Sequence, residues 1–429
     1  MLDHWYAVGV RAVDPAAVTA RALRRAPRTT APPAVLALGK AAAAMLNGAC
    51  TALAETGVVP VSALVITDEP VDGGSTATVI VGDHPVPGPQ SARAAAALAE
   101  WTARLPAETP VIVLLSGGTS ALIAAPLPGI TPDELRAAFD ILHELGLDIV
   151  TMNAVRRQLT RWSGGRLRTA LGSRSVACYV ISDVPTTELA AVGSGPLIGG
   201  PLDVEGMQRR VINSPAFPQF APSVQRALSV PPPAIVPMTP HTVVASGGTM
   251  LYDLGQELAT TGLGFRSPVR PLVGTTTAGA AIVSHEIGAA LPDIDWDVLG
   301  WAGELTVALG DTHGVGGRCQ QFAVELALGL EAAARESPGI REVLVLAAGT
   351  DGRDGPTDAA GAYANAHLPG LLRSAGYDPH QLVRDRDTHA ALDRVGALHR
   401  PGRTGTNVAD MILVSRTAAI GRASIPGDG

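Results

Sequence analysis

Lysine is nearly absent from this chain of 429 residues. Lys40 is the single lysine, and the other 31 of the 32 lysine and arginine residues are arginines. Any chemistry that requires an ammonium group therefore involves Lys40 or the N-terminus. Cysteine is also scarce: Cys50, Cys178 and Cys319 lie far apart and are odd in number. Their spacing indicates neither a disulfide framework nor a zinc site of the CxxC type.

Long apolar runs, a basic leader and a surplus of positive charge are missing as well. No apolar stretch reaches the ~18 residues that a membrane span needs. The N-terminal sequence MLDHWYAVGVRAVDP lacks the basic region and apolar core of a signal peptide. The formal net charge is −7 at pH 7, with no dense arginine stripe, which argues against a nucleic-acid partner. We therefore expect a cytoplasmic protein without a membrane or nucleic-acid partner.

The chain does contain many short apolar runs, which alternate with alanine-rich helical stretches. Hydrophobic residues make up 46% of it, enough for large cores. Continuous apolar strands between helices are typical of a parallel sheet covered on both faces. The pattern predicts an α/β fold with a doubly wound, mostly parallel sheet. The predicted strands are 34–39, 61–67, 110–116 and 176–182, and the predicted helices are 40–55, 91–105, 134–149 and 153–171, with one more starting near Ser120.

The length predicts more than one domain. Residues 214–240 are rich in proline and lack a long periodic element, so we interpret them as a linker. A second set of strands and helices follows, including a strong helix in QQFAVELALGLEAAARE and a strand in EVLVLAAG. We predict a first domain over residues 1–232 and a second, smaller α/β domain over 241–429.

Ligands of open parallel sheets bind beyond the carboxyl ends of the strands, so the loops there are the candidate site. Lys40 follows the first predicted strand and opens a helix, where its charge can meet an anion. The loop 116–120, with the sequence SGGTS, joins a buried strand to a helix. It is either an anion-binding nest or simply a tight turn. It is not a Walker A motif, because no Gly-Lys-Ser/Thr follows.

Three further loops carry charge or glycine. Asp183 ends a strand and can bind Mg²⁺ or a hydroxyl, or cap the next helix, and a turn at 193–196 follows it. Arg318 opens a long helix after a glycine-rich loop. An arginine at a helix N-terminus opposes the macrodipole, so we expect a bound phosphate or carboxylate to compensate its charge.

The last loop, GTDGRDGPTDAAG, places Asp351, Asp354 and Asp358 directly after a strand. Its spacing is not that of an EF-hand. Such carboxylates suit Mg²⁺, a general base for a hydroxyl, or pairing with an arginine, although Asp358 can instead cap a helix. Together the loops supply cations for phosphate and carboxylates for a metal or an alcohol, which favours phosphoryl transfer. Hydride transfer fits less well, because no GxGxxG opens a helix near the first strand.

These loops resemble the glycerate 2-kinase family, the two-domain kinases with a C-terminal MOFRL domain. The matching motifs span residues 36–414 in family order: LGKAAAAM, GDHPVPGPQS, LSGGTSAL, NAVRRQLTRWSGGRL, ISDV, VGSGPL, GELTV, GVGGRCQQ, GTDGRDGPTDAAGA and TGTNVADMIL. The resemblance implies a Rossmann-like N-terminal domain, a smaller C-terminal domain and an active-site cleft between them. It also implies phosphorylation of D-glycerate at the 2-hydroxyl, with ATP and Mg²⁺ as cofactors.

The resemblance also implies residue roles. Lys40, Arg318 and Asp351 correspond to catalytic residues, and Asp183 to a metal ligand. Asn153, Arg156 and Asp354 correspond to substrate-binding residues. The nucleotide-binding positions are Ser116, Gly117, Gly118, Thr119, Ser120, Gly193, Ser194 and Gly195. The partners are then a small hydroxy acid and a nucleotide; the oligomeric state is left open, with a homodimer as one option.

Some loops depart from the family pattern. Ser163 stands where the family usually has lysine, and Thr186-Thr187 where it usually has Gly-Asp. Cys319 and Gln321 replace asparagine and glutamate. Arg161 or Arg166 can supply the lost positive charge, but with a different geometry. These departures support two alternatives to a glycerate kinase: a diverged enzyme with another substrate or chemistry in a secondary-metabolic pathway, or a non-catalytic relative that binds ligand.

Overall fold

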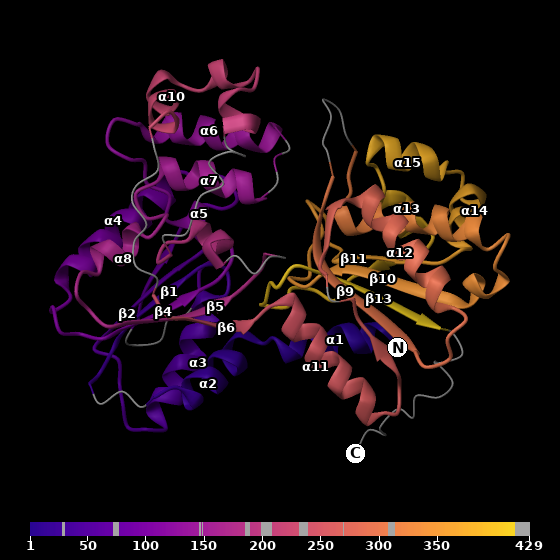
Figure 1. Cartoon of the computed structure of the whole chain (residues 1–429), viewed down its shortest axis with the longest axis horizontal. Helices are drawn as coiled ribbons and strands as arrows, with labels where there is room; N and C mark the ends of the chain where they lie inside the picture. Colours follow the sequence, from indigo (N-terminus) through magenta and orange to yellow (C-terminus); the bar gives the residue numbers. More distant parts are fainter. Residues whose placement is uncertain are drawn as a thin grey trace. The chain divides into compact units, whose positions relative to one another are not determined.

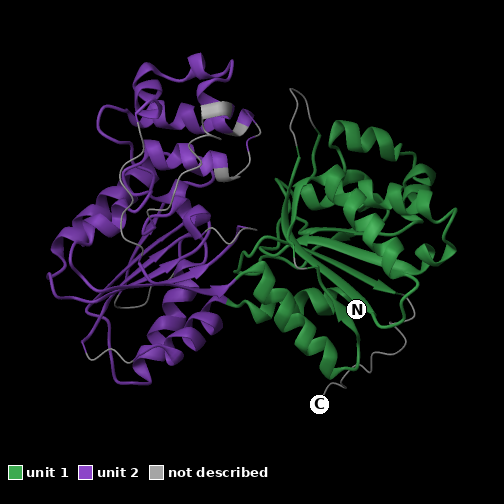
Figure 2. Cartoon of the chain, viewed as in Figure 1, with its two compact units in different colours: residues 1–14, 246–429 green, residues 15–245 purple. Residues whose placement is uncertain are grey.

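The chain forms two compact units, shown in different colours in Figure 2. Unit 2 comprises residues 15–245, and unit 1 combines residues 1–14 with residues 246–429. None of the described helices is long and apolar enough to cross a membrane. The computed structural model describes residues 1–27, 31–71, 77–145, 147, 149–184, 189–198, 208–230, 239–268, 270–307 and 314–416.

Unit 2 is built on a six-stranded sheet in the order β3-β2-β1-β4-β5-β6, in which every pairing is parallel. Every residue of β1 and of β4 is buried, as expected for strands covered on both faces. In the register, Leu38 of β1 lies beside Leu115 of β4. The strands are β1 (Ala34–Leu38), β2 (Ser62–Thr67), β3 (Ala77–Val81), β4 (Val111–Leu115), β5 (Val176–Ile181) and β6 (His241–Ala245).

Helices cover both faces of this sheet (Figure 1). Helices α2 and α3 lie on one face, and α4, α5 and α8 on the other. Helices α6, α7 and α10 lie beyond that second group and share an apolar core that includes Phe139, Val155 and Phe220. The helices are α2 (Pro15–Arg25), α3 (Ala42–Ala54), α4 (Pro89–Arg104), α5 (Thr119–Leu122), α6 (Pro132–Glu144), α7 (Ile149–Leu159), α8 (Arg166–Ala170) and α10 (Pro222–Leu228), with short turns η1 (Leu189–Ser194), η2 (Gln208–Ile212) and η3 (Phe217–Gln219).

Unit 1 contains a seven-stranded mixed sheet. Its order is β12-β11-β10-β13-β9-β7, and β8 also pairs with β9. The pairings are antiparallel except those of β7 and β8 with β9. The strands are β7 (Phe265–Arg266), β8 (Leu272–Thr275), β9 (Val298–Thr306), β10 (Val343–Gly349), β11 (Gly361–Ala364), β12 (Leu398–His399) and β13 (Asp410–Arg416).

This sheet is also covered on both faces. Helices α1 and α11 pack on one face, and α12 and α13 on the other, as Figure 1 shows. The core on the α13 side includes Phe322 and Trp296. The helices are α1 (Leu2–Ala12), α11 (Gly247–Thr260), α12 (Thr276–Ala290), α13 (Arg318–Ala333), α14 (Leu368–Ser374), α15 (Pro379–Asp385) and α16 (His389–Arg394), with the turn η4 (Pro338–Glu342).

The unit boundaries differ from the domain limits drawn from the sequence. Residues 1–14 belong to unit 1, because Trp5 and Tyr6 of α1 are buried there and the Tyr6 hydroxyl donates to the Gly349 carbonyl at 2.7 Å. Strand β6 belongs to unit 2, although the second domain was expected to begin at residue 241. Of the predicted linker, residues 214–230 include η3 and α10, which pack on the α6–α7 core. Residues 231–238 lie outside the described part.

The predicted helix 153–171 is wrong as one element. Helix α7 ends at Leu159 and α8 begins at Arg166. Between them, Gly164 and Gly165 have φ of +62° and +81°, in the left-handed region that ends a right-handed helix. The break turns the chain so that the N–H groups of Gly164 and Gly165 donate to the carbonyls of Ser194 and Gly195. The interruption therefore anchors the 193–196 turn.

Candidate active site

Lys40 and the 116–120 loop flank the point where the strand order of unit 2 reverses. Lys40 follows β1, and Ser116 follows β4, the two strands from which the sheet grows in opposite directions. Such a switch point is the usual ligand site of a doubly wound sheet. The Lys40 N–H donates to the Gly117 carbonyl at 3.0 Å, so the two loops are joined. The predicted ligand loops are thus brought together within this unit.

Gly118 lets two side chains lie against the 116–120 loop. Its φ is +86°, and a Cβ added there would lie 3.2 Å from Lys40 Cγ and 3.2 Å from His84 Cδ2. Both contacts are tighter than ordinary van der Waals distance. The half-buried Lys40 has no hydrogen bond or ion pair from its ammonium group to the described residues. Lys40 and His84 therefore line the turn, and the lysine charge is available to a ligand.

Asp183 approaches the same loop from the end of β5. A Cβ on Gly117 would lie 1.8 Å from Asp183 Oδ2, so the carboxylate rests where any side chain would stand. Within the described residues, no group of three or more histidine, cysteine, aspartate or glutamate side chains is arranged to hold a metal. Asp183 thus lies in the right loop cluster for its predicted metal contact, which stays a prediction.

The hydroxyls of two predicted nucleotide-binding residues form hydrogen bonds with the protein backbone. Ser116 Oγ accepts the Ala41 N–H at 3.1 Å and donates to the Leu38 carbonyl at 3.2 Å, and Thr119 Oγ1 donates to the Ser116 carbonyl at 2.8 Å. These contacts fix the loop. Any ligand contact of the loop therefore depends on its backbone N–H groups and on neighbouring side chains more than on these two hydroxyls.

The 193–195 turn is tied to the same loop by a chain of polar contacts. Ser120 Oγ and Ser194 Oγ are 2.7 Å apart, and Ser194 Oγ donates to Asn153 Oδ1 at 3.1 Å. Asn153 Nδ2 in turn donates to the Ala191 carbonyl at 2.9 Å. Asn153 and Ser194 are buried, and Gly193 and Gly195 have positive φ. The structure therefore gives Asn153 and Ser194 a supporting contact, and their predicted ligand contacts stay predictions.

Of the basic residues near the altered loop, Arg156 and Arg166 are partly buried, whereas Arg161 is exposed and lies 5.2 Å from the Trp162 ring centroid. The Arg156 guanidinium lies 4.7 Å from the Phe139 ring centroid, and burial lowers its pKa to about 10. Arg166 Nη1 donates to the carbonyls of Arg157, Thr160 and Ser163, at 2.6, 3.1 and 3.1 Å. Ser163 is buried and accepts the Thr160 hydroxyl at 2.6 Å. Arg166 thus completes the end of α7, and Ser163 supplies no charge where the family pattern has lysine.

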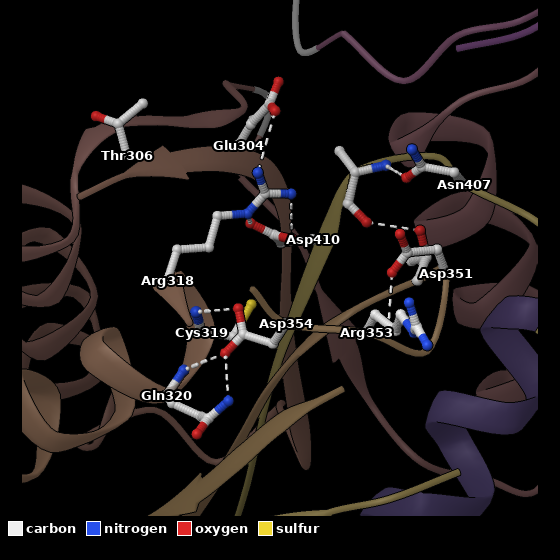
Figure 3. Close-up of polar contacts among 12 residues, drawn as sticks. Glu304, Thr306, Arg318, Cys319, Gln320, Asp351, Arg353, Asp354, Asn407 and Asp410 are labelled. Atoms are coloured by element: carbon white, nitrogen blue, oxygen red, sulfur yellow. Dashed lines mark hydrogen bonds and ion pairs between the residues drawn. The ribbon is translucent and has the colours of Figure 1, made fainter. Parts of the chain in front are cut away.

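In unit 1, Arg318 is held by two carboxylates (Figure 3). Its Nε lies 2.7 Å from Asp410 Oδ2, its Nη2 donates to Asp410 Oδ1 at 2.9 Å, and its Nη1 donates to Glu304 Oε1 at 3.2 Å. Burial lowers the pKa of Arg318, but the charges of Asp410 and Glu304 outweigh it and the pKa is raised well above its usual value. The chain's own carboxylates therefore compensate the charge of this arginine, and its predicted contact with a bound anion stays a prediction.

The Arg318 side chain is 36% exposed, whereas Asp410 is 1% exposed. Adjacent strands bring the two acids together, because Asp410 of β13 pairs with Gly303 of β9, the neighbour of Glu304. A bidentate carboxylate fixes the orientation of a guanidinium. The partly exposed guanidinium of Arg318 is thereby held in a fixed orientation, and its predicted ligand contact stays a prediction.

Asp354 caps helix α13. It is 2% exposed, and its carboxylate accepts the N–H of Cys319 at 3.0 Å and both the N–H and the Nε2 of Gln320, at 2.8 and 3.1 Å (Figure 3). A Cβ on Gly317 would lie 2.1 Å from Asp354 Cγ, so the glycine admits the carboxylate. The observed role of Asp354 is structural, and its predicted substrate contact stays a prediction.

Asp351 differs from the other two aspartates of its loop. One oxygen, Oδ1, accepts the Arg353 N–H at 3.0 Å, and the half-buried carboxylate makes no further hydrogen bond or ion pair with the described residues. Asp358 is exposed and pairs with Arg400 at 2.9 Å and with His389 at 3.3 Å. The option that Asp358 caps a helix is wrong, because the strand β11 follows it.

Two of the remaining positions that depart from the family pattern have structural contacts, and two lie outside the described residues. Cys319 is buried, and burial raises the pKa of its thiol well above the usual value. Gln321 Nε2 donates to Glu325 Oε1 at 2.9 Å and to the Val383 carbonyl at 3.0 Å. Thr186 and Thr187 lie outside the described residues.

Sequence reasoning did not single out His84, Glu304 or Asp410. All three lie within motifs that carry the family resemblance: GDHPVPGPQS, GELTV and TGTNVADMIL. His84 follows β3 and so belongs to the same strand-end series as Lys40 and Asp183. A search of every strand end for a charged or imidazole side chain would have found it.

Two family models match this chain. Residues 1–229 match the model described as Domain of unknown function (DUF4147), and residues 298–410 match the MOFRL family. These matches cover the segments that contain Lys40 and Arg318, respectively.

Similar proteins extend over most of the chain. It is 30% identical to a D-glycerate 2-kinase of Thermotoga maritima over 88% of this chain and 89% of that protein. It is 31% identical to a putative hydroxypyruvate reductase of Agrobacterium vitis over 88% and 97%, respectively. The crystal structure of glycerate kinase from Thermotoga maritima matches with a TM-score of 0.77 and 26% identity, over 96% of this chain and 98% of that one, which confirms the predicted α/β fold. The chain therefore belongs to the glycerate 2-kinase family, with a DUF4147 domain in its N-terminal half and a MOFRL domain in its C-terminal half.

Proposed function

We propose that this protein transfers the γ-phosphoryl group of ATP to the 2-hydroxyl of D-glycerate or a closely related small hydroxy acid. The observation that carries the proposal is the position of Lys40. The only ammonium side chain of the protein lies at the switch point of the parallel sheet, against a glycine turn and with its charge uncompensated by described residues. The relatives named as glycerate kinases support the reaction.

The chemistry required is modest, because phosphoryl transfer depends mainly on positioning and charge. The substrate hydroxyl oxygen forms a bond to the γ-phosphorus, the bond to the β-γ bridging oxygen breaks, and ADP leaves. Lys40 neutralises phosphate charge, while the fixed guanidinium of Arg318 binds a phosphate or the substrate carboxylate. The alcohol proton passes to a carboxylate, for which we propose Asp351.

Mg²⁺ suits the carboxylate of Asp183. This residue provides an oxygen ligand, and Mg²⁺ usually binds through one or two carboxylates while it keeps several waters and contacts substrate phosphates. The lack of a cluster of three acidic or imidazole ligands among described residues is therefore compatible with it. When bound, the ion would neutralise phosphate charge; the residues themselves orient it and the hydroxyl.

A diverged acceptor is the second candidate, and the Ser163 loop favours it. Ser163 is buried, and the neighbouring Arg166 is committed to three carbonyls, so the charge that the family pattern places there is not replaced by Arg166. A substrate with one anionic group fewer, or with its anion elsewhere, would fit such a change.

A panel of acceptors tests the proposal against two alternatives: a kinase with a changed acceptor, and a reductase. ADP release is measured with ATP, Mg²⁺ and D-glycerate, L-glycerate, glycolate, D-lactate or tartrate, and hydroxypyruvate with NADH is assayed in parallel by absorbance. We expect D-glycerate to give the highest kcat/KM. Turnover with another hydroxy acid alone would support a changed acceptor, and NADH oxidation without any ADP release would contradict a kinase.

A further inference from the structure

A cavity of about 500 Å³ lies in unit 1 between α1 and the segment that contains β12. Its walls include Ala7 and Val10 from α1 and Leu398 and Pro401 from the other side. This volume falls within the range of small-molecule sites, which are largely apolar with a few polar groups. The cavity includes none of the residues to which we assign a part in phosphoryl transfer.

The polar wall of the cavity carries more positive than negative charge. Three guanidinium groups line it, those of Arg11, Arg400 and Arg403, against the single carboxylate of Asp3. Arg400 is already paired with Asp358 and Asp393, at 2.9 and 2.8 Å. The exposed Arg11 side chain, by contrast, has no hydrogen bond or ion pair to the described residues. A positive charge is thus left for a ligand.

The one carboxylate is held by side chains of the same wall. Asp3 accepts a hydrogen bond from the Tyr363 hydroxyl and lies 3.0 Å from His399 Nδ1. His399 is only 5% exposed, and its Nε2 is buried without a hydrogen-bond partner in the described structure. A buried unpaired ring nitrogen is unusual, because buried polar groups normally find a partner. This nitrogen is not exposed to the cavity, so we assign it no contact with a ligand.

The cavity is joined to the loop that carries Asp351. Thr404 lines it, and the Thr404 hydroxyl donates to the Thr350 carbonyl at 2.5 Å. Tyr6 also lines it and donates to the Gly349 carbonyl at 2.7 Å. A ligand that orders these two side chains would also restrain the backbone just before Asp351.

We propose that this cavity is a second binding site, which takes a small metabolite with one oxyanion, phosphate or carboxylate, and a short apolar body. Arg11 binds the oxyanion, and the Ala7, Val10, Leu398 and Pro401 surface contacts the body. The site does not depend on the reaction proposed above, because its residues are separate from those assigned to phosphoryl transfer.

Hydrogen–deuterium exchange of the full-length protein tests the site without an activity measurement. Inorganic phosphate and acetate serve as separate probes, with sodium chloride at matched ionic strength as reference. We expect one or both probes to slow exchange in peptides from 1–14 and 398–406. Which probe protects more distinguishes a phosphate from a carboxylate ligand, and protection by neither would overturn the proposal.

Two arginine variants complete the test. Arg11→Gln removes the available guanidinium from the exposed end of α1, and we expect the apparent Kd of the protecting probe to rise about tenfold, as for one lost charge-assisted hydrogen bond. Arg25→Gln is the control, because Arg25 is an exposed helix-terminal arginine of unit 2. Equal weakening in both variants, or unchanged protection in Arg11→Gln, would show that protection comes from general charge effects and would refute the site.

Discussion

Arg318 is the side chain whose chemistry is most constrained by its neighbours. Two carboxylates fix three of its donor contacts, and one of them, Asp410, is almost completely buried. Removing an arginine from such a pair leaves an acid without its partner. The effect of a substitution at Arg318 on activity must therefore be separated from its effect on stability.

A double-mutant cycle makes this separation. Arg318→Ala should lower the free energy of unfolding by about 1–3 kcal/mol, because Asp410 loses its partner while the half-exposed position softens the effect. Adding Asp410→Asn should restore much of that stability without restoring turnover. Denaturant unfolding and kcat/KM of Arg318→Ala, Asp410→Asn and the double variant give the answer. Full turnover in the stable double variant would remove Arg318 from the mechanism.

Asp354 provides a pH test of the capping contact. Burial raises its pKa to about 6, against the opposing effect of the Cys319 and Gln320 N–H groups. The folded state therefore binds more protons than the unfolded state between about pH 4 and 6. The contribution of Asp354 to stability is full below about pH 4 and falls as the pH rises through 6.

The destabilisation caused by Asp354→Asn should accordingly be largest near pH 4 and smaller at pH 7. Asp358→Asn is the control, because Arg400 lowers the pKa of Asp358 and the sign is reversed. Its smaller effect should stay nearly constant from pH 5 to pH 7 and decrease only below about pH 4. Urea unfolding at pH 4, 5, 6 and 7 measures the destabilisation of both variants. The same pH dependence in the two variants would contradict the raised pKa of Asp354.

The turn between β4 and α5 can be tested by adding a single methyl group at Gly118. Gly118→Ala places a methyl group against Lys40 and His84, whereas Gly57→Ala meets nothing within 4 Å. Both glycines have positive φ, +86° and +72°, so both variants carry a similar backbone penalty of about 1 kcal/mol.

We expect similar melting temperatures for the two alanine variants but a kcat/KM about 100-fold lower in Gly118→Ala alone, since small displacements of positioning groups have effects of that size. Steady-state kinetics and thermal unfolding make the comparison. Equal activity of the two variants would place the reaction away from this turn.

The same connections show how far the sequence could be read. Strands β1 and β4 are predictable because they are short, wholly apolar runs between helices, and Lys40 is predictable because it follows one of them. The partners of Arg318 are not, because Asp410 lies 92 residues away and meets it only through the β9–β13 pairing. The gap between α7 and α8 depends on two glycines whose positive φ no periodicity reveals.

At the scale of the whole chain, helix α1 belongs to a different unit from the residues that follow it in sequence. A helix at the N-terminus forms part of unit 1, whose other residues begin at 246. Leu2, Trp5 and Tyr6 are each at most 3% exposed, and Thr406 Oγ1 donates to the Val13 carbonyl at 3.1 Å. Sequence order gave no indication of this, since composition does not show which sheet a helix covers.

Residues 1–14 should therefore stabilise unit 1 in a rearranged fragment. Residues 246–429 followed by a flexible linker and residues 1–14 should unfold at higher urea than 246–429 alone, because each of the three buried side chains contributes about 1.5–3 kcal/mol. A fragment with the order of residues 1–14 scrambled is the control. Identical midpoints for the rearranged and scrambled fragments would contradict the unit assignment.

The most direct measurement of the proposed reaction is ³¹P NMR of the purified protein with ATP, Mg²⁺ and D-glycerate, run beside Lys40→Ala. Lys40 makes no contact through its ammonium group to the described residues, so this variant should stay folded. We predict signals of ADP and 2-phosphoglycerate for the natural protein, and none above background for Lys40→Ala. Formation of 2-phosphoglycerate at an equal rate by both proteins, or ATP unchanged by the folded natural protein, would contradict the account.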